Sequence, residues 1–254
     1  MSFQSATTPE PLGGGRYRAT MDRAWWIVRG PNGGYVAAIL VRAMESELRM
    51  PERQLRSLTV HYPRVPPEGD VEIEVAIERS GRGLSTISAR LLDGNRLIAL
   101  ALGAFSGAYE SPLSYDEAPM PGVALPDPLP PPRDDGPMPF ANQWRMAGAL
   151  GRDGRPHTGG WMLPREEHPV DAALLVALAD AWIPAPFVVT GAPFAAPTID
   201  LTVHVRAALP LPPQPVLGEF RSTVSRDGFF EEDGRLWAPD GTLLAQSRQL
   251  ALAL

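Results

Sequence analysis

The sequence has no cysteine and no lysine among its 254 residues. The absence of cysteine excludes disulfide scaffolds, iron–sulfur clusters, thiolate zinc sites and cysteine nucleophiles. All 23 basic residues are therefore arginine. Codon bias in a GC-rich genome accounts for this usage, and so would several guanidinium groups that grip phosphates. Composition alone does not separate the two explanations.

Long apolar runs are also missing. No stretch approaches the ~18 uninterrupted apolar residues needed to span a bilayer, and Met1-Ser2-Phe3-Gln4 is not a basic region followed by an apolar run. We therefore expect no membrane span, no signal peptide and a cytoplasmic location. The formal net charge of −6 argues against a nucleic-acid partner, which requires a basic face.

The first half of the chain predicts one helix followed by antiparallel strands. The turn Gly30-Pro31-Asn32-Gly33-Gly34 precedes an apolar segment that predicts a mostly buried helix ending near Met50-Pro51. Alternation with a period of two then predicts strands, and Asp93-Gly94 is a hairpin signal. These strands are expected at 58–62, 71–77, 84–92 and 97–105.

A proline-rich segment separates two halves. Residues 110–139 contain ten prolines in thirty residues, a density that no helix or strand tolerates. We expect a surface linker over 110–139, an N-terminal repeat over 1–109 and a C-terminal repeat over 140–254.

The second half repeats the order of the first. A short strand at 161–163 and a helix that starts at Pro169 and runs through Asp171 to Trp182 precede strands expected at 198–206, 216–225, 234–238 and 243–252. Leu58-Thr59-Val60-His61 recurs as Leu201-Thr202-Val203-His204 at an offset of 143, and Asp93-Gly94 recurs as Asp240-Gly241 at an offset of 147. Identical residues, matching hairpins and the same order of elements together indicate an internal duplication.

Three polar residues of the second half fall where the first half is apolar. At the repeat offsets, Thr198 lies opposite Leu55 and Gln249 opposite Leu102, and Asp180 ends an apolar helix. Burying such groups costs several kcal/mol unless they satisfy one another. Each has a plain structural explanation as a helix end, a strand start or an exposed strand residue, but the cluster on one repeat indicates a site.

An apolar helix followed by long antiparallel strands, twice over, predicts an α+β fold in which each helix is wrapped by a curved sheet. The arrangement resembles the double hotdog fold of the acyl-CoA thioesterase II (TesB-like) family. The resemblance covers nearly the whole chain outside the linker. It rests on Gly33-Gly34, the strand 57–64, Gly81-Arg82, Asp180, Thr198-Ile199-Asp200 and Gln249.

The resemblance implies a thioester hydrolase, with acyl-CoA as the partner and no cofactor. In that family the residues matching Asp180, Thr198 and Gln249 hold and activate the attacking water. Because there is neither a cysteine nor a Gly-x-Ser-x-Gly elbow, direct attack by water is favoured over an acyl-enzyme route. Amides at Gly33 and Gly34 are the expected oxyanion donors, and a homodimer is expected.

Other polar and aromatic residues have weaker grounds for a functional role. Asp200 and His204 share a strand face, but His61 is the repeat equivalent of His204, which favours a structural role. His157 and His168 have no metal-ligand spacing, so no metal site is expected. Trp25, Trp26, Trp161 and Phe187 could shape an acyl tunnel or simply pack in the core. Two alternative functions remain: a non-catalytic acyl-CoA or lipid-binding protein, and a hydratase, which the missing Asp-x-Asn-Pro-x-His pattern disfavours.

Overall fold

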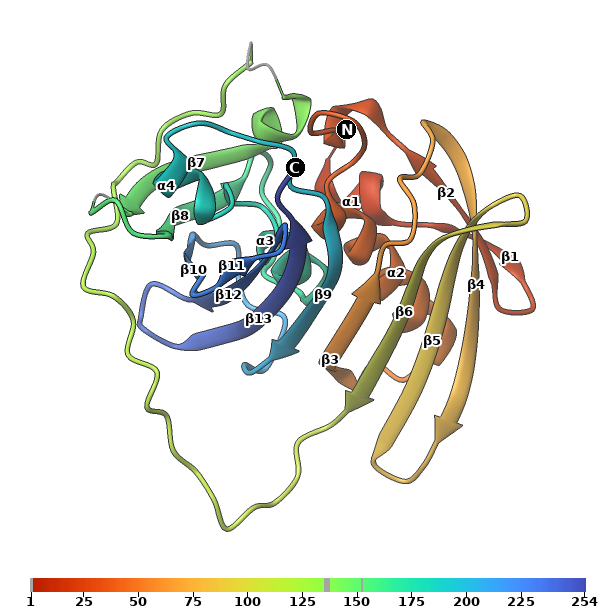
Figure 1. Ribbon diagram of the computed structural model, residues 1–254. Coiled ribbons are helices and arrows are strands. Elements are labelled where there is room, and N and C mark those ends of the chain that lie inside the picture. The colour runs from red at the N-terminus through yellow and green to blue at the C-terminus, as the bar shows by residue number, and fades with distance from the viewer. Residues whose placement is uncertain (1, 135–137, 152) are drawn as a thin grey trace.

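The strands of both halves form one continuous antiparallel sheet. The computed structural model describes residues 2–134, 138–151 and 153–254, and Figure 1 shows its elements. In the described residues the sheet has 13 strands in the order β1-β2-β4-β5-β6-β3-β9-β13-β12-β10-β8-β7, with β11 paired to β12. The first-half strands are β1 (Glu10–Gly13), β2 (Arg16–Met21), β3 (Gln54–His61), β4 (Gly69–Ser80), β5 (Leu84–Asp93) and β6 (Arg96–Ser106). The second-half strands are β7 (Trp144–Leu150), β8 (His157–Pro164), β9 (Thr198–Val205), β10 (Val216–Arg221), β11 (Ser225–Arg226), β12 (Phe229–Trp237) and β13 (Leu243–Leu252).

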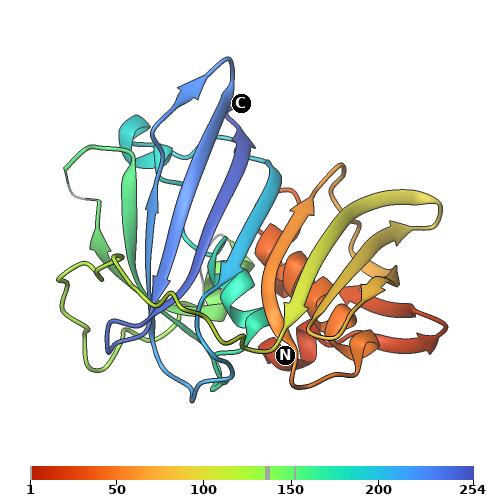
Figure 2. The same cartoon turned by 90° about the horizontal axis from the view of Figure 1, so that it is seen from below.

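Two buried helices lie side by side against this sheet. Figure 2 shows the sheet running across the molecule with both helices on one side of it. They are α2 (Gly33–Leu48) and α3 (Ala172–Leu178), and the side chains of Asn32 and Asp171 cap their N-termini. Shorter helices are α1 (Phe3–Thr7) and α4 (Pro186–Thr190), with 3₁₀ turns η1 (Arg23–Trp25) and η2 (Pro139–Gln143). The predicted α+β double hotdog fold is confirmed.

The second helix is shorter than its sequence predicts. We expected it to run to Trp182, but α3 ends at Leu178. The N–H groups of Asp180 and Ala181 then donate to carbonyls only three residues back, at 3.2 and 3.3 Å. This tightened turn is common where a helix ends, and it places Asp180 beyond the helix instead of on its last turn.

The duplication is visible in the pairing of β3 with β9. Thr59 pairs with Thr202, its own repeat equivalent, and their hydroxyls are 3.0 Å apart. On either side, Leu58 pairs with Val203 and Val60 with Leu201. A pseudo-twofold axis therefore passes between the two threonines, and the sheets of the two repeats join edge to edge.

Strand limits in the second half differ from prediction. β10 ends at Arg221 instead of Ser225, and β12 begins at Phe229 instead of Gly234. The short strand β11 pairs back onto β12, so the chain turns earlier than the apolar pattern indicates. The consequence is that Glu231 and Glu232 belong to a strand.

The proline-rich segment packs on the outer face of the second repeat. It passes around the outside of the molecule (Figure 1). The indole N–H groups of Trp161 and Trp237 donate to the carbonyls of Ala124 and Ala118, at 2.9 and 3.0 Å. Leu129 is buried against these tryptophans. The division into repeats at 1–109 and 140–254 with a linker at 110–139 stays a prediction.

Gly34 lies at a tight contact between α2 and the end of α3. A Cβ atom on Gly34 would lie 2.7 Å from the carbonyl oxygen of Ala177 and 2.9 Å from the Cβ of Asp180. Contacts this short do not occur in folded proteins without movement of the neighbours. The glycine at the start of α2 thus permits α3 to end against it.

We expect Gly34→Ala to lower the free energy of unfolding by about 1–3 kcal/mol, because the added methyl overpacks the contact between α2 and α3. Gly148→Ala, where the same atom meets open space, is the control and changes stability by less than about 0.5 kcal/mol. Urea denaturation of both variants measures the difference. Equal free energies of unfolding for the two variants would show that α2 and α3 can move apart to accept the added methyl group without cost.

Candidate functional site

The carboxylate of Asp180 lies at the N-terminus of the other repeat's helix. Its Oδ2 accepts hydrogen bonds from the Gly34 N–H at 2.8 Å and from the Asn32 side-chain amide at 3.0 Å. Asn32 also donates to the backbone carbonyl of Asp180 at 2.7 Å. A negative charge is favoured at a helix N-terminus, so the first repeat supplies the environment for a side chain of the second.

Burial dominates the protonation of this group. It raises the pKa of Asp180 to about 6, although the N–H groups of Gly34 and Gly33 and the amide of Asn32 act in the opposite direction. The carboxylate is therefore ionised at neutral pH, yet far more basic than an ordinary aspartate. This combination suits a general base.

Thr198 and Gln249 meet on neighbouring strands. The Thr198 hydroxyl donates to Gln249 Oε1 at 3.2 Å, across the pair formed by β9 and β13. Gln249 is buried rather than exposed, which removes the structural explanation of an outward-facing strand residue. The other end of its amide donates to Glu232 Oε1 at 2.9 Å.

Glu232 connects this pair electrostatically to Asp180. It is only 3% exposed, and its Oε2 accepts the N–H of Ala185 at 2.5 Å. Burial raises the pKa of Glu232 to about 7, and the negative charge of Asp180 adds to the rise. Asp180, Glu232, Gln249 and Thr198 are called the polar cluster below.

Sequence reasoning missed Glu232, although a signal was present. Phe230, Glu232 and Leu236 alternate along β12 and all are buried. A period-two pattern extended back from Leu236 puts a glutamate on the inward face, where it requires a partner. The late start assigned to this strand concealed the pattern.

The register between repeats corrects one predicted equivalence. Gln249 pairs with Leu201 on β9, while Gly103 pairs with the repeat-equivalent Leu58 on β3. Gln249 therefore corresponds to Gly103, not to Leu102, which faces outward and is 51% exposed. The offset of 147 taken from the hairpins is one residue too long for this strand.

The same strand register shows which residues of the first repeat are equivalent to Glu232 and Thr198. Glu232 pairs with Gln249, and Ile87 pairs with Gly103, so Glu232 stands where the first repeat has Ile87. Thr198 corresponds to Leu55, as predicted from the offset of 143. The first repeat is apolar at each of these strand positions, whereas the second carries the polar cluster there.

Tyr62 closes the other side of Asp180. Its hydroxyl donates to the carbonyl of Gly33 at 2.9 Å. Burial raises the pKa of Tyr62 well above its usual value, and the charges of Asp180 and Asp200 add to this. The phenol is neutral and fixes the turn that presents Gly33 and Gly34.

The predicted oxyanion donors face the carboxylate. The Gly34 N–H is bonded to Asp180, and a Cβ on Gly33 would lie 3.0 Å from Asp180 Oδ2 and 3.4 Å from the Tyr62 ring. The two glycines thus bring the start of α2 against Asp180, and their role toward an oxyanion stays a prediction.

The remaining candidates lie outside the polar cluster. His61 and His204 are exposed beside the pseudo-twofold axis. His157 is bonded to Glu219 at 3.0 Å, and His168 to Asp171 and Arg42 at 3.2 and 3.3 Å. In the part of the chain that the structure describes, no three histidine, aspartate or glutamate side chains are grouped as metal ligands would be.

Of the aromatic candidates, only Phe187 lies near the polar cluster. It contacts Phe194, which contacts Phe230 on β12, two residues from Glu232. Trp25 stacks on Tyr35 in the first repeat's core, Trp26 lies under the Arg23 guanidinium, and Trp161 packs under the linker. These three tryptophans have packing roles.

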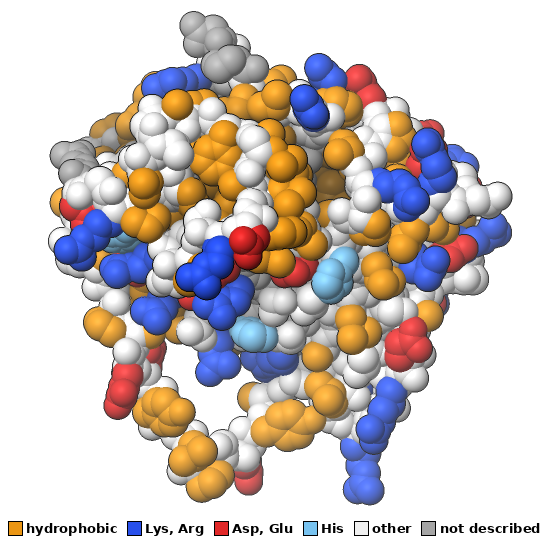
Figure 3. Space-filling view, in the orientation of Figure 1, with side chains coloured by type: hydrophobic (Ala, Val, Ile, Leu, Met, Phe, Trp, Pro, Cys, Tyr) orange, Lys and Arg blue, Asp and Glu red, His pale blue; other side chains and the backbone are white. Residues whose placement is uncertain are grey.

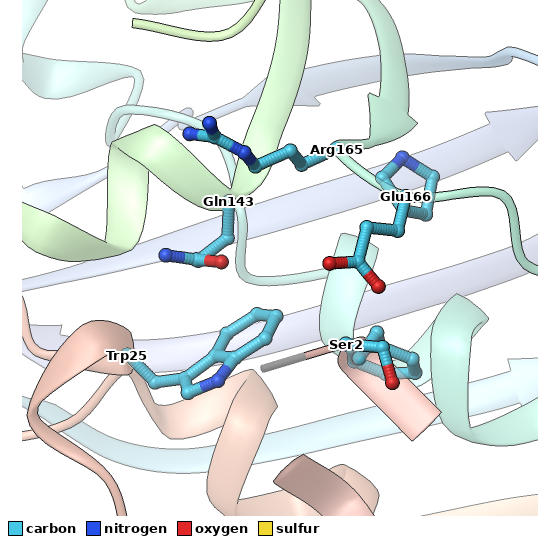
Figure 4. A pocket seen from close by; sticks show the side chains of 7 residues that line it. Ser2, Trp25, Gln143, Arg165 and Glu166 are labelled. Atoms are coloured by element: carbon cyan, nitrogen blue, oxygen red, sulfur yellow. The ribbon is translucent and has the colours of Figure 1, made fainter. Parts of the chain in front are cut away.

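Hydrophobic side chains gather over the region of α4 and the C-terminal end of β13 (Figure 3), where Ile183, Val189 and Leu254 are exposed. A cavity of about 10 Å³ at Ser2, Trp25, Gln143, Arg165 and Glu166 (Figure 4) has none of the polar cluster in its lining. It is too small for anything larger than a single water.

The fold is a double hotdog, and comparison with known families gives the class of protein. The N-terminal domain of acyl-CoA thioesterases matches residues 22–106, and the C-terminal domain matches residues 115–253. The chain belongs to the acyl-CoA thioesterase family, and the resemblance to its TesB-like members is confirmed. None of the helices in the described ranges has the length and apolar character to cross a membrane.

Several solved structures are similar over nearly the full chain. A hot dog fold protein of unknown function from Alicyclobacillus acidocaldarius is 26% identical, with a TM-score of 0.88 over 99% of this chain and 97% of that one. A putative thioesterase II from Thermobifida fusca is 26% identical, with a TM-score of 0.86 over 99% of each chain. The acyl-CoA thioesterase II TesB2 of Mycobacterium marinum, 19% identical, shows the fold alone, with a TM-score of 0.81 over 100% of this chain and 98% of that one.

One curated relative is similar over a shorter region. The thioesterase-like protein TwmA of Talaromyces wortmannii is 32% identical over 97 residues, which are 37% of this chain and 28% of that protein. The match thus spans little more than a quarter of the length of this relative.

Asp180→Asn is expected to stabilise the fold at alkaline pH. Because the folded-state pKa of about 6 lies above the ordinary value of 3.8, the folded chain holds this proton more tightly, and stability falls as pH rises from about 4 to 6. Asparagine can accept the same two hydrogen bonds without a charge. We expect a gain of about 1–3 kcal/mol at pH 8 that shrinks below pH 5.

Chemical denaturation at several pH values measures this gain. Asp116→Asn, at an exposed linker carboxyl, is the control and leaves the pH dependence of stability unchanged. A constant difference between wild type and Asp180→Asn across this pH range would contradict the assigned burial of the Asp180 charge.

Proposed function

We propose that the protein hydrolyses a fatty or related acyl-CoA thioester to the free acid and CoA, by attack of a water that Asp180 activates. The single observation that carries the proposal is the Asp180 carboxylate held on the start of α2, with its charge acting on Glu232, the hydrogen-bond partner of Gln249. Family membership supports a thioester hydrolase. The substrate class and the role of each residue are our proposal.

The reaction needs a base, a positioned water and donors for the oxyanion. Asp180 takes a proton from the water as the water oxygen bonds to the thioester carbon. The electron pair of the C=O bond moves onto the carbonyl oxygen. The tetrahedral intermediate then collapses, the C–S bond breaks, and the Asp180 proton passes to the leaving CoA sulfur. Thr198 holds the water and Gln249 holds the Thr198 hydroxyl, which lowers the entropic cost of reaching the transition state.

The amides of Gly33 and Gly34 suit this order of reaction steps because Asp180 loses its negative charge as the thioester oxygen gains one. In the resting state the Gly34 N–H binds the Asp180 carboxylate. When Asp180 accepts a proton its charge disappears, at the moment when charge develops on the thioester oxygen. The amides are then free to stabilise the oxyanion, an interaction whose loss typically costs about 3 kcal/mol.

We expect Asp180→Asn to lower kcat for thiol release from acyl-CoA by at least about 100-fold, because general-base catalysis contributes factors of this size. A panel of short to long acyl-CoAs with a thiol reagent measures turnover. Thermal melting of the same samples shows that the variant is folded. If acyl-CoA raises the melting temperature but wild type releases no thiol, the chain is a binding protein and the proposal is wrong.

Thr198→Val is expected to lower kcat about 10-fold or more, because the water loses one positioning contact. Thr202→Val, on the same strand at the pseudo-twofold axis, is the matched control and retains wild-type turnover. Parallel loss in both variants would indicate that β9 is merely distorted.

The remaining parts of the proposal are a role in lipid metabolism, a cytoplasmic location and a homodimer. Double hotdog subunits have sheet edges, here β1 and β7, that are available for association. Size-exclusion chromatography with light scattering tests the assembly. We expect twice the chain mass of 27.5 kDa, and a single peak at 27.5 kDa would contradict the dimer.

A further inference from the structure

Glu232 presents two acceptor oxygens to two fixed donors. Its Oε2 accepts the N–H of Ala185, the residue before α4, and its Oε1 accepts the Gln249 side-chain amide. Backbone N–H groups can only donate, and an ionised carboxylate can only accept. With Glu232 ionised, the Gln249 NH₂ group must therefore face Glu232.

The orientation of Gln249 in turn fixes the Thr198 hydroxyl. Since the NH₂ end faces Glu232, Gln249 Oε1 faces Thr198, and the hydroxyl donates its proton to it at 3.2 Å. The lone pairs of Thr198 are then the part of the hydroxyl that remains for a further partner. Thr198 is set as an acceptor.

An acceptor at Thr198 suits the attacking water. A water that donates one hydrogen to Asp180 and the other to Thr198 keeps a lone pair for the thioester carbon. If the Gln249 amide were reversed, its NH₂ group would donate to Thr198, and the hydroxyl proton would turn toward the water and occupy that lone pair.

We propose that Glu232 is a positioning residue that holds the Gln249 amide in the orientation that makes Thr198 an acceptor for the attacking water. The inference rests on the proposed hydrolysis and adds to it a fourth residue and a second proton. Neither the predicted site residues nor the first repeat, which has Ile87 at the equivalent position, supplies this function.

The charges around Glu232 predict how the site responds to pH. The groups that act on it are Asp180 in the turn after α3, Glu231 beside it in β12, and the two hydrogen-bond donors. Asp180, with a pKa of about 6, ionises first, and Glu232, with a pKa of about 7, ionises against that charge. Activity is then highest when both carboxyl groups are ionised, and kcat falls more steeply at low pH than the ionisation of Asp180 alone would give.

Glu232→Gln tests the inference because it imitates the protonated residue. Its carbonyl must accept the Ala185 N–H, so its NH₂ group faces Gln249 and reverses that amide. We expect kcat at pH 8 to fall at least 10-fold with little change in KM, and the acid limb to depend on one proton instead of two. Glu231→Gln makes the same change one residue away on the opposite face of β12 and is the control. It keeps the wild-type rate at pH 8 and the steep acid limb, which moves to slightly lower pH because a negative charge beside Glu232 is removed.

A double-mutant cycle distinguishes positioning from a structural role. In a Thr198→Val background no hydroxyl remains to orient, so adding Glu232→Gln is expected to lower kcat by less than twofold. A full additional 10-fold loss in the double variant overturns the inference. The wild-type pH profile is a second readout that needs no substitution, and a one-proton acid limb also overturns it.

The same measurements keep this inference apart from the proposed function. If wild type hydrolyses acyl-CoA and Asp180→Asn does not, but Glu232→Gln retains the wild-type rate and acid limb, only the role of Glu232 is wrong. If wild type releases no thiol from any acyl-CoA, the proposed hydrolysis fails and the inference fails with it.

Discussion

The antiparallel pairing of β3 with β9 about Thr59 and Thr202 is the contact on which the rest of the structure depends. It turns two curved sheets into one and relates the repeats by a pseudo-twofold axis. That axis brings the two helices together in opposite directions, so the end of α3 meets the start of α2. The hydrogen bond from Gly34 to Asp180 exists only because of this geometry. Neither half could build the arrangement alone, since one supplies the carboxylate and the other the amides.

The polar cluster is costly to bury, and each of its members has hydrogen-bond partners. Asp180 has backbone and amide donors, Glu232 accepts from Ala185 and Gln249, and Thr198 completes the chain of hydrogen bonds. Burial without a cationic partner raises the pKa of a carboxyl group, so the group takes up a proton at a higher pH than an exposed one. The resulting values near neutrality are what proton transfer requires. Stability is thereby lowered at the place where chemistry is proposed.

Much of the fold could be predicted from sequence because its signals are local. Alternation in β4 and the Asp93-Gly94 hairpin depend on neighbours along the chain, and the repeated Leu-Thr-Val-His letters sit on the axis itself. The end of α3 could not be predicted, because the contact with Gly34 that shapes the turn comes from the other repeat. The true partner of Gln249 depends on register across two strands, and the hairpin offset misses it by one residue. Glu232 was missed because the predicted strand began at Gly234, beyond the glutamate, and only the three-dimensional neighbours explain why a carboxylate lies on the inward face.

The pseudo-symmetry of the chain has a consequence for how such a site can arise. In a true homodimer of single hotdog units, every substitution appears twice, so each buried carboxylate would be introduced at two related positions together. A covalently joined pair of repeats is released from this constraint. Leu55, Ile87 and Gly103 can continue to pack tightly while Thr198, Glu232 and Gln249 diverge. One half of the molecule therefore acts as a stabilising scaffold, and the destabilisation that accompanies a polar interior is incurred once instead of twice.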